Sequence, residues 1–253
     1  MSTEMALEHL PVLAAELAAM VDAQPGETVV DATFGAGGHA RLLAQAIGAD
    51  GTLIAIDRDP QARERFEPFA DEVDCATRFI PGAFAAGLQD LLQAGQHVDV
   101  LVLDLGVSSF QIDTPQRGFS YIHDAPLDMR MDPSCGLSAA ELVAEWDERR
   151  LRSVFREYGE ERYAGQIARA IVRERDREPI ATTTRLVEVL TAAVPAPARF
   201  AAGHPAKRVF QALRIAVNDE LGELDAGLEA GWELLAENGR FAGISSTALK
   251  TVV

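Results

Sequence analysis

The sequence is poor in cysteine and lysine and has no long apolar run. Its two cysteines, Cys75 and Cys135, are too few for a disulfide framework or a metal cluster. No uncharged apolar stretch reaches the roughly 18 residues that a membrane-spanning helix needs. Met1–Leu10 also lacks the basic segment that begins a signal peptide. We therefore expect a cytoplasmic protein without a metal site.

Positive charge is scarce overall and unevenly distributed. The net charge of −16 argues against a general nucleic-acid binder, because neutralising phosphates requires clustered basic side chains. Residues 111–220 nevertheless contain 16 of the 23 basic residues, and only two of the 23 are lysine. Guanidinium groups match the geometry of phosphate. This middle segment is predicted to meet an anionic partner, and a solvated helical face of mixed charge is the equally good alternative.

Short apolar segments alternate with helical ones in the first hundred residues. Such alternation, with strands apolar on both faces, is typical of a parallel sheet with helices on both sides. The predicted strands are Thr28–Thr33, Thr52–Asp57, Thr77–Ile80 and Val98–Leu105, and the helices between them are Arg41–Ile47, Gln61–Ala70 and Phe84–Leu92.

The pattern changes after Gln111, beyond which no strand is predicted before Gly239. The predicted segments are an ordered loop at Asp113–Pro133, helices over Ser138–Val194 that start with a capping box at Ser138 and Glu141, a linker at Pro195–Pro205, a helix from about Pro205 to Glu237 with a possible break near Gly222, and a last strand at Arg240–Ser245. We therefore expect an α/β domain made of residues 1–111 and 211–253, with a helical domain at 112–210 inserted into it.

A glycine-rich turn follows the first predicted strand, in the sequence DATFGAGGH from Asp31 to His39. Glycines at the start of a helix let the backbone approach a ligand closely. The G-x-G-G spacing differs from the G-x-G-x-x-G of dinucleotide sites. Asp57 closes the second strand, where an acidic side chain accepts hydrogen bonds from ribose hydroxyls. The pattern predicts a ligand containing adenosine with a free ribose, and NAD remains open at this point.

Asp104 ends the fourth predicted strand, in the sequence LDLGVSS. The carboxyl ends of parallel strands meet at one edge of a sheet, so we expect Asp31, Asp57 and Asp104 to converge on one cleft. The alternative for each aspartate is a helix cap or a turn.

Several longer motifs carry a family resemblance. They are HLPVL from His9, DATFGAGGH, AIDRDPQA, LDLGVSS, RGFS, PLDMRMD, YGEERYA, IARAIV and FQALRIAVNDEL. Between about residues 9 and 244 the sequence resembles the bacterial S-adenosylmethionine-dependent methyltransferases that modify N4 of a cytosine in the decoding region of small-subunit ribosomal RNA (the RsmH or MraW family). The resemblance implies an α/β, Rossmann-like methyltransferase domain with an inserted all-helical substrate-recognition domain.

The resemblance also implies which residues contact S-adenosylmethionine. These cofactor-binding candidates are Gly37, Gly38, His39, Asp57, Phe84, Asp104 and Gln111. A core position is a nearly equal alternative for Phe84, and His39 can contribute its backbone amide alone.

A second set of candidates serves the reaction and the RNA substrate in the small ribosomal subunit. Asp104, with Ser108 and Ser109, is expected to accept a hydrogen bond from the cytosine amine. Arg117, Asp128 and Arg130 are expected to hold the flipped nucleotide. The alternative for Arg130 is a salt bridge to an aspartate that orders its loop.

The end of the sequence departs from the family pattern after Ile244, because the family's Ser-Phe-His-Ser-Leu-Glu-Asp segment does not follow. We therefore expect the last strands of the sheet to be missing and catalysis to be weakened. Three alternatives to an active ribosomal RNA enzyme stay open: a catalytically impaired cofactor- or RNA-binding remnant, a methyltransferase for another RNA or for DNA cytosine, and an NAD-dependent oxidoreductase. The G-x-G-G spacing disfavours the third.

Overall fold

A computed structural model describes residues 13–196 and 204–245, which form two compact units. The first unit comprises residues up to Gly106 and from Gly222 onward, and the second is Val107–Leu221. The expected boundary at residues 210 and 211 is therefore misplaced. It falls inside α10 (Pro205–Val217), whose apolar side chains belong to the core of the second unit. In the described part of the chain, no helix is long and apolar enough to cross a membrane.

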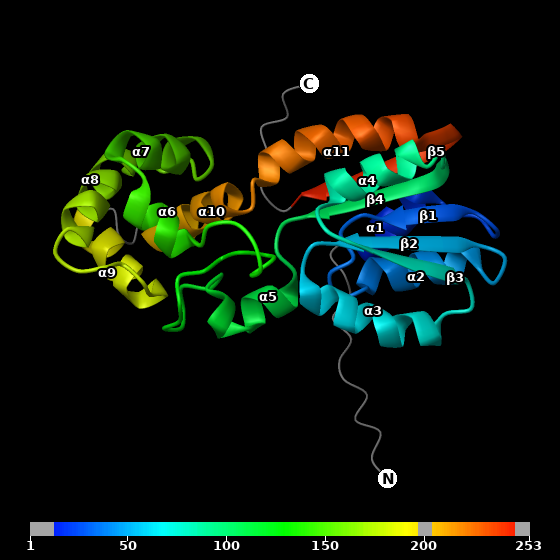
Figure 1. Cartoon of the computed structure of the whole chain (residues 1–253), viewed down its shortest axis with the longest axis horizontal. Coiled ribbons are helices and arrows are strands. Elements are labelled where there is room, and N and C mark those ends of the chain that lie inside the picture. The colour runs from blue at the N-terminus through cyan, green and yellow to red at the C-terminus, as the bar shows by residue number, and fades with distance from the viewer. Residues whose placement is uncertain (1–12, 197–203, 246–253) are drawn as a thin grey trace, which may run out of the picture. The chain divides into compact units, whose positions relative to one another are not determined.

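The first unit is built on a five-stranded sheet of order β3-β2-β1-β4-β5, in which every pairing is parallel (Figure 1). The strands are β1 (Thr28–Asp31), β2 (Thr52–Asp57), β3 (Ala76–Pro81), β4 (Val98–Leu105) and β5 (Leu235–Ser245). The helices are α1 (Ala14–Val21), α2 (Gly38–Ile47), α3 (Pro60–Glu72), α4 (Phe84–Gln93) and α11 (Glu220–Leu234). The predicted parallel α/β sheet is confirmed.

Alternate residues of the central strands supply two cores, one on each face of the sheet. Val29 and Val100 pack with α1, α2 and α3 on one face. Val30 and Leu101 pack with α4 and α11 on the other face. Successive side chains of a strand point to opposite faces, so a strand covered on both sides must be apolar throughout. This explains the continuous apolar runs in the sequence.

The order of the strands reverses between β1 and β4. The chain passes from β1 to β2 and β3 on one side, and β4 then pairs with the other side of β1. In open parallel sheets, ligands bind beyond the carboxyl ends of the strands at such a reversal point. Asp31 and Asp104 lie at this point.

The C-terminal elements differ from the prediction in their bounds. The helix expected to reach Glu237 ends at Leu234, and β5 begins at Leu235. Leu235 already pairs with Val98, and the register then shifts before Arg240 pairs with Val100. Asn238 keeps the backbone of a turn, with a φ of 65°, within the segment where the register shifts, so β5 contains the expected turn as an irregularity. The break expected near Gly222 falls instead between α10 and α11, at Asn218 and Asp219.

Helices make up the regular structure of the described part of the second unit, apart from one isolated bridge between Pro126 and Thr182. They are α5 (Ser109–Asp113), the short 3-10 helix η1 (Pro115–Arg117), α6 (Ala139–Glu145), α7 (Glu148–Glu157), α8 (Ala164–Arg175), α9 (Thr183–Ala193) and α10. The predicted capping box at Ser138 and Glu141 is confirmed. Most of the predicted linker and residues 246–253 lie outside the described residues.

Close packing in the second unit makes Gly159 sensitive to substitution. A Cβ at Gly159 would lie 2.5 Å from the backbone oxygen of Arg208 and 2.9 Å from that of Phe155. We expect Gly159→Ala to lower the free energy of unfolding by about 1–3 kcal/mol, because backbone has to move. Urea denaturation measures the change.

Gly165→Ala is the matched control, since the nearest atom to its added Cβ is the Arg152 Cδ at an ordinary 3.7 Å. Near the start of α8, alanine should be neutral or stabilise by about 0.5–1 kcal/mol. Equal loss of stability in both variants would contradict the packing argument.

Candidate functional site

The glycine-rich turn connects β1 to α2. Gly35 and Gly37 adopt φ angles of 55° and 80°, in the left-handed region that favours glycine. A Cβ at Gly37 would also lie 2.8 Å from the ring of Phe34. Gly37 caps α2 without any side-chain hydrogen bond, which leaves the first turn of the helix open to a ligand's acceptor atoms.

Asp57, at the end of β2, holds this turn. One carboxylate oxygen accepts a hydrogen bond from the N–H of Gly35 at 2.7 Å, and the other accepts from the N–H of Asp59 at 2.8 Å. Burial raises the pKa of Asp57 to about 6, although both hydrogen bonds act in the opposite direction. Each oxygen has a second lone pair, so the same carboxylate can accept ribose hydroxyls.

Asp31, His39 and Asp104 meet at the reversal point between β1 and β4. The His39 Nε2 lies 3.5 Å from the carboxylate of Asp104. The backbone N–H of Asp104 donates a hydrogen bond to the Thr33 Oγ1 at 2.6 Å. Asp31 is fully buried, and burial raises its pKa to about 7. The three aspartates expected to converge interact here, since the charges of both Asp57 and Asp104 act to raise the pKa of Asp31.

Several polar atoms of this cluster are buried without a hydrogen-bond partner in the described part of the chain. They are the second carboxylate oxygen of Asp31 and both ring nitrogens of His39. Buried polar groups normally have hydrogen-bond partners, so unpaired groups at the carboxyl ends of the strands are suited to bind a polar ligand. Asp31 also has part of the turn-forming role that was the alternative to ligand binding, because its carboxylate accepts a hydrogen bond from the N–H of Thr33.

Phe84, at the start of α4, is half-buried and packs against α11. A Cβ at Gly227 would lie only 2.2 Å from the Phe84 ring, so the glycine makes room for it. Phe84 thus has the core contacts that were the alternative to a ligand role. Its contact with adenine stays a prediction.

The candidates that follow β4 belong to the second unit. Gln111 is buried, and its side-chain oxygen accepts a hydrogen bond from the N–H of Ser108 at 3.1 Å. This contact caps α5, while Ser109 is exposed in its first turn. The amide group of Gln111 therefore stabilises a helix start, and its role toward a cofactor stays a prediction.

Arg117, Asp128 and Arg130 order the predicted loop. The Arg117 guanidinium is buried and donates to the backbone oxygens of Arg130 and Met131, at 2.9 and 2.8 Å. Arg130 makes a two-pronged salt bridge with Asp128, with N–O distances of 2.8 and 2.7 Å. This pair holds the pKa of Asp128 below its usual range, mainly through the Arg130 hydrogen bonds that outweigh burial. The salt-bridge alternative for Arg130 is therefore present, and nucleotide binding stays a prediction.

Asn218 was missed by the sequence analysis. Its side chain donates to the backbone oxygen of Met129 and accepts from the N–H of Met131, both at 2.8 Å. It thereby supports Met129, which adopts an uncommon φ of 64° while fully buried. Asn218 lies within the FQALRIAVNDEL motif, but a contact with a loop 87 residues away leaves no local signal.

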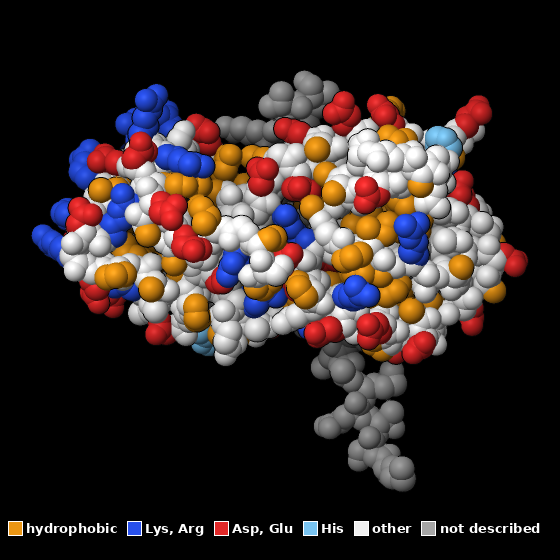
Figure 2. Space-filling view, viewed as in Figure 1, with side chains coloured by type: hydrophobic (Ala, Val, Ile, Leu, Met, Phe, Trp, Pro, Cys, Tyr) orange, Lys and Arg blue, Asp and Glu red, His pale blue; other side chains and the backbone are white. Residues whose placement is uncertain are grey.

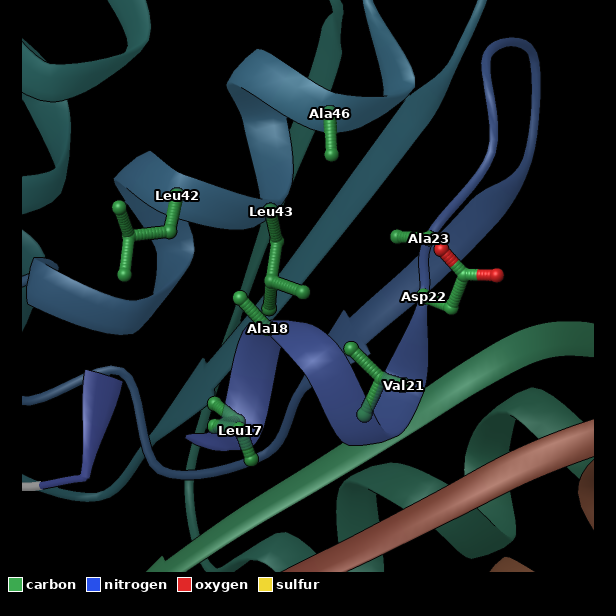
Figure 3. A pocket seen from close by; sticks show the side chains of 8 residues that line it. All are labelled: Leu17, Ala18, Val21, Asp22, Ala23, Leu42, Leu43 and Ala46. Atoms are coloured by element: carbon green, nitrogen blue, oxygen red, sulfur yellow. The ribbon is translucent and has the colours of Figure 1, made fainter. Parts of the chain in front are cut away.

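A pocket of about 190 Å³ lies elsewhere in the first unit, between α1 and α2 (Figure 3). Its lining residues are Leu17, Ala18, Val21, Asp22, Ala23, Leu42, Leu43 and Ala46. The residues that α2 contributes, Leu42, Leu43 and Ala46, follow its first turn, so this pocket is separate from the glycine-rich turn. Within the described ranges, no group of three or more His, Cys, Asp or Glu side chains could hold a metal ion.

The reversal of strand order, the glycine-rich turn and the aspartates at the ends of β1, β2 and β4 define a Rossmann-like α/β protein. The chain belongs to the MraW methylase family, which it matches over residues 6–251. Its first unit is thus a Rossmann-like methyltransferase domain. The match extends beyond residue 244, where the sequence motifs were expected to end.

Relatives of known name support this assignment. The ribosomal RNA small subunit methyltransferase H of Symbiobacterium thermophilum is 48% identical over 251 residues, which cover 97% of this chain and 78% of the relative. The protein of the same name from Geotalea daltonii is 49% identical over 248 residues, 96% of this chain and 78% of the relative. The one from Mycolicibacterium paratuberculosis is 49% identical over 230 residues, 89% of this chain and 59% of the relative.

The raised pKa of Asp31 predicts a pH-dependent stability. A carboxyl group with a pKa higher in the folded than in the unfolded state binds protons more tightly when folded, so its contribution to stability falls as pH rises from about 4 to about 7. Asp31→Asn is neutral throughout. Between pH 5 and pH 8, its free energy of unfolding should rise relative to the parent by about 1–3 kcal/mol.

Urea denaturation of the ligand-free protein at both pH values measures this difference. Asp90→Asn, at an exposed position of α4, controls for the loss of one negative charge. Parallel pH profiles for the parent and Asp31→Asn would show that the Asp31 carboxyl group does not titrate as its burial implies.

Proposed function

We propose that this chain uses S-adenosylmethionine to methylate N4 of a cytidine in the decoding region of small-subunit ribosomal RNA, with the small ribosomal subunit in the cytoplasm as its substrate. Membership of the MraW methylase family and the names of the relatives support the reaction and the RNA. The structural observation that carries the proposal is the set of carboxylates at the ends of β1, β2 and β4 around the glycine-rich turn.

The residues present fit this cofactor. The turn allows close approach at Gly37 and Gly38, and the backbone amide of His39 lies in the open first turn of α2. Asp57 would accept the ribose hydroxyls. The negative charge around Asp31 suits a ligand that carries a positive sulfur and an ammonium group. Phe84, Asp104 and Gln111 complete the proposed set of contacts.

When bound, the cofactor supplies a methyl group already activated on a positively charged sulfur. The chain's own task is alignment, because the exocyclic cytosine amine is a poor nucleophile. Asp104 would accept a hydrogen bond from the amine as its proton becomes acidic, with Ser108 and Ser109 in support. The His39 Nε2 lies 3.5 Å from the Asp104 carboxylate, so His39 would help to orient it.

The loop of Arg117, Asp128 and Arg130 is proposed to receive the target nucleotide, which has to leave its stack to be methylated. This proposal is supported by the order of the loop. Arg117 and Asn218 hold its backbone, and the salt bridge between Asp128 and Arg130 orients both side chains. A loop ordered in advance lowers the entropy cost of binding.

The alternatives raised by the sequence are less well supported. Family membership favours methyl transfer over NAD-dependent oxidation. The relatives' names favour small-subunit RNA over DNA or another RNA. A catalytically impaired remnant differs from the proposed enzyme in one measurable respect, since it binds cofactor but transfers no methyl group.

Asp57 provides the first test. We expect Asp57→Ala to weaken S-adenosylmethionine binding by about 1–3 kcal/mol, because ribose hydroxyls lose their buried acceptor. The affinity of the parent should also fall as pH drops through about 6, where the Asp57 carboxylate takes up a proton. Calorimetry measures both effects.

Asp50→Ala is the control, because Asp50 is exposed just before β2, at the opposite end of that strand. Since Asp57 also holds Gly35, each variant is checked for its free energy of unfolding. Unchanged affinity in a folded Asp57→Ala protein would remove Asp57 from the site.

Methyl transfer provides the second test. Small subunits that lack the modification should be methylated faster than protein-free RNA, since a net charge of −16 gives little non-specific attraction to bare phosphates. Isotope-labelled cofactor reports the rate, and mass spectrometry of the digested RNA shows whether the methyl group is on N4 of cytidine. Equal rates on both substrates would refute the preference for particles, and cofactor binding without transfer to either would favour the impaired remnant.

A further inference from the structure

Three arginines form a row on the outer face of α7. Arg149, Arg152 and Arg156 are exposed and follow one another at spacings of three and four residues, which places them on one side of the helix. The opposite side is buried in the core of the second unit through Leu151, Val154 and Phe155. We call these three residues the α7 arginine row.

The three guanidinium groups are unpaired within the described ranges, where no ion pair or hydrogen bond engages them. Two other arginines of the second unit show what a paired guanidinium looks like here. Arg214 makes a two-pronged salt bridge with Glu220, and Arg185 contacts three glutamates. The Arg152 side chain passes near Gly165 in the first turn of α8, where an added Cβ would lie 3.7 Å from its Cδ and 3.9 Å from its Nε. The row therefore keeps its hydrogen-bond donors available.

Three acidic residues beside the row are engaged elsewhere. Asp147 caps α7 by accepting the N–H of Arg150 at 2.7 Å. Glu148 pairs with Arg169 of α8 at 3.5 Å, and Glu157 accepts the hydroxyl of Ser153 at 2.7 Å. These three acidic side chains are thus committed to a cap and to other partners, and none of them contacts the row.

Lys and Arg side chains also gather over α7 and α8 in the space-filling view (Figure 2). None of the exposed large hydrophobic residues among the described positions lies on α7. Interfaces between proteins have an apolar core, which this face lacks. Arginines offer paired donors that match phosphate, so the chemistry of the face favours a nucleic-acid backbone over a protein surface.

We propose that the α7 arginine row binds the phosphate backbone of the small-subunit RNA. The row spans about 10 Å along the helix axis, at 1.5 Å per residue, so it can contact neighbouring phosphates of one strand. Backbone contacts of this kind fix the position of the RNA and read no base. The inference rests on the proposed function, since it takes the substrate RNA as the ligand.

The test replaces the row with glutamine, as R149Q/R152Q/R156Q. The matched control, R63Q/R78Q/R177Q, removes the same charge from three other exposed arginines. Binding of small subunits and of protein-free small-subunit RNA is measured over a series of salt concentrations. Urea denaturation and cofactor affinity show that both variants fold as the parent does.

We expect the row variant to lose tenfold or more in affinity for both ligands at moderate salt. Its slope of log affinity against log salt should be shallower by roughly 2–3, because three phosphate contacts are lost. With small subunits as substrate, KM should rise while kcat at saturation stays at the parental value. The control should retain most of the parental affinity.

Parental affinity and slope in the row variant would overturn the proposal. So would a loss of affinity confined to intact subunits with an unchanged salt slope, because the partner would then be a ribosomal protein. Failure of the arginine-row proposal can be distinguished from failure of the proposed function. If the parent binds subunits but transfers no methyl group, that function fails, while the comparison of salt slopes still tests the row.

Discussion

The hydrogen bond from the Gly35 N–H to the Asp57 carboxylate joins the glycine-rich turn to the end of β2, and the rest of the site is arranged around it. It fixes the backbone from which α2 starts, and α2 in turn carries His39 to within 3.5 Å of Asp104 on β4. The cost is a buried carboxylate with a pKa raised to about 6, which two backbone donors only partly offset. Such a cost is typical of a site organised for a ligand that brings its own donors and positive charge.

In the second unit, buried side chains likewise hold the backbone of a loop through hydrogen bonds. Buried Arg117 and Asn218 hold the backbone around Met129, whose left-handed conformation is uncommon for a side chain of its size. Their donors and acceptors are spent on main-chain atoms, so the loop has its shape before any substrate arrives. The salt bridge between Asp128 and Arg130 adds rigidity at the half-exposed side of the loop.

Charge is divided between the two units in a way that reconciles an acidic protein with an RNA substrate. Three carboxylates of the first unit, those of Asp31, Asp57 and Asp104, lie at the carboxyl ends of its strands, where we propose that they face a positively charged cofactor. In the second unit, Asp147 caps a helix, and Glu148 and Glu220 pair with arginines outside the α7 row. The arginines of the α7 row remain available because no acidic side chain in the described part of the unit contacts them.

The sequence by itself determined the class of fold and the positions of Asp57 and Asp104. Apolar strands that alternate with helices permit few arrangements other than a parallel sheet. The conformation of the glycine-rich turn depends on Gly35 and Gly37 themselves, so the sequence indicates it directly. Only the tertiary structure decided where α11 gives way to β5, that Arg130 pairs with Asp128, and that Asn218 holds the loop at Met129. The physical reason is the range of the interactions. Periodicity and turn geometry depend on residues that are neighbours in the chain. Strand register and buried polar contacts join residues that are far apart in the sequence, so no local pattern indicates them.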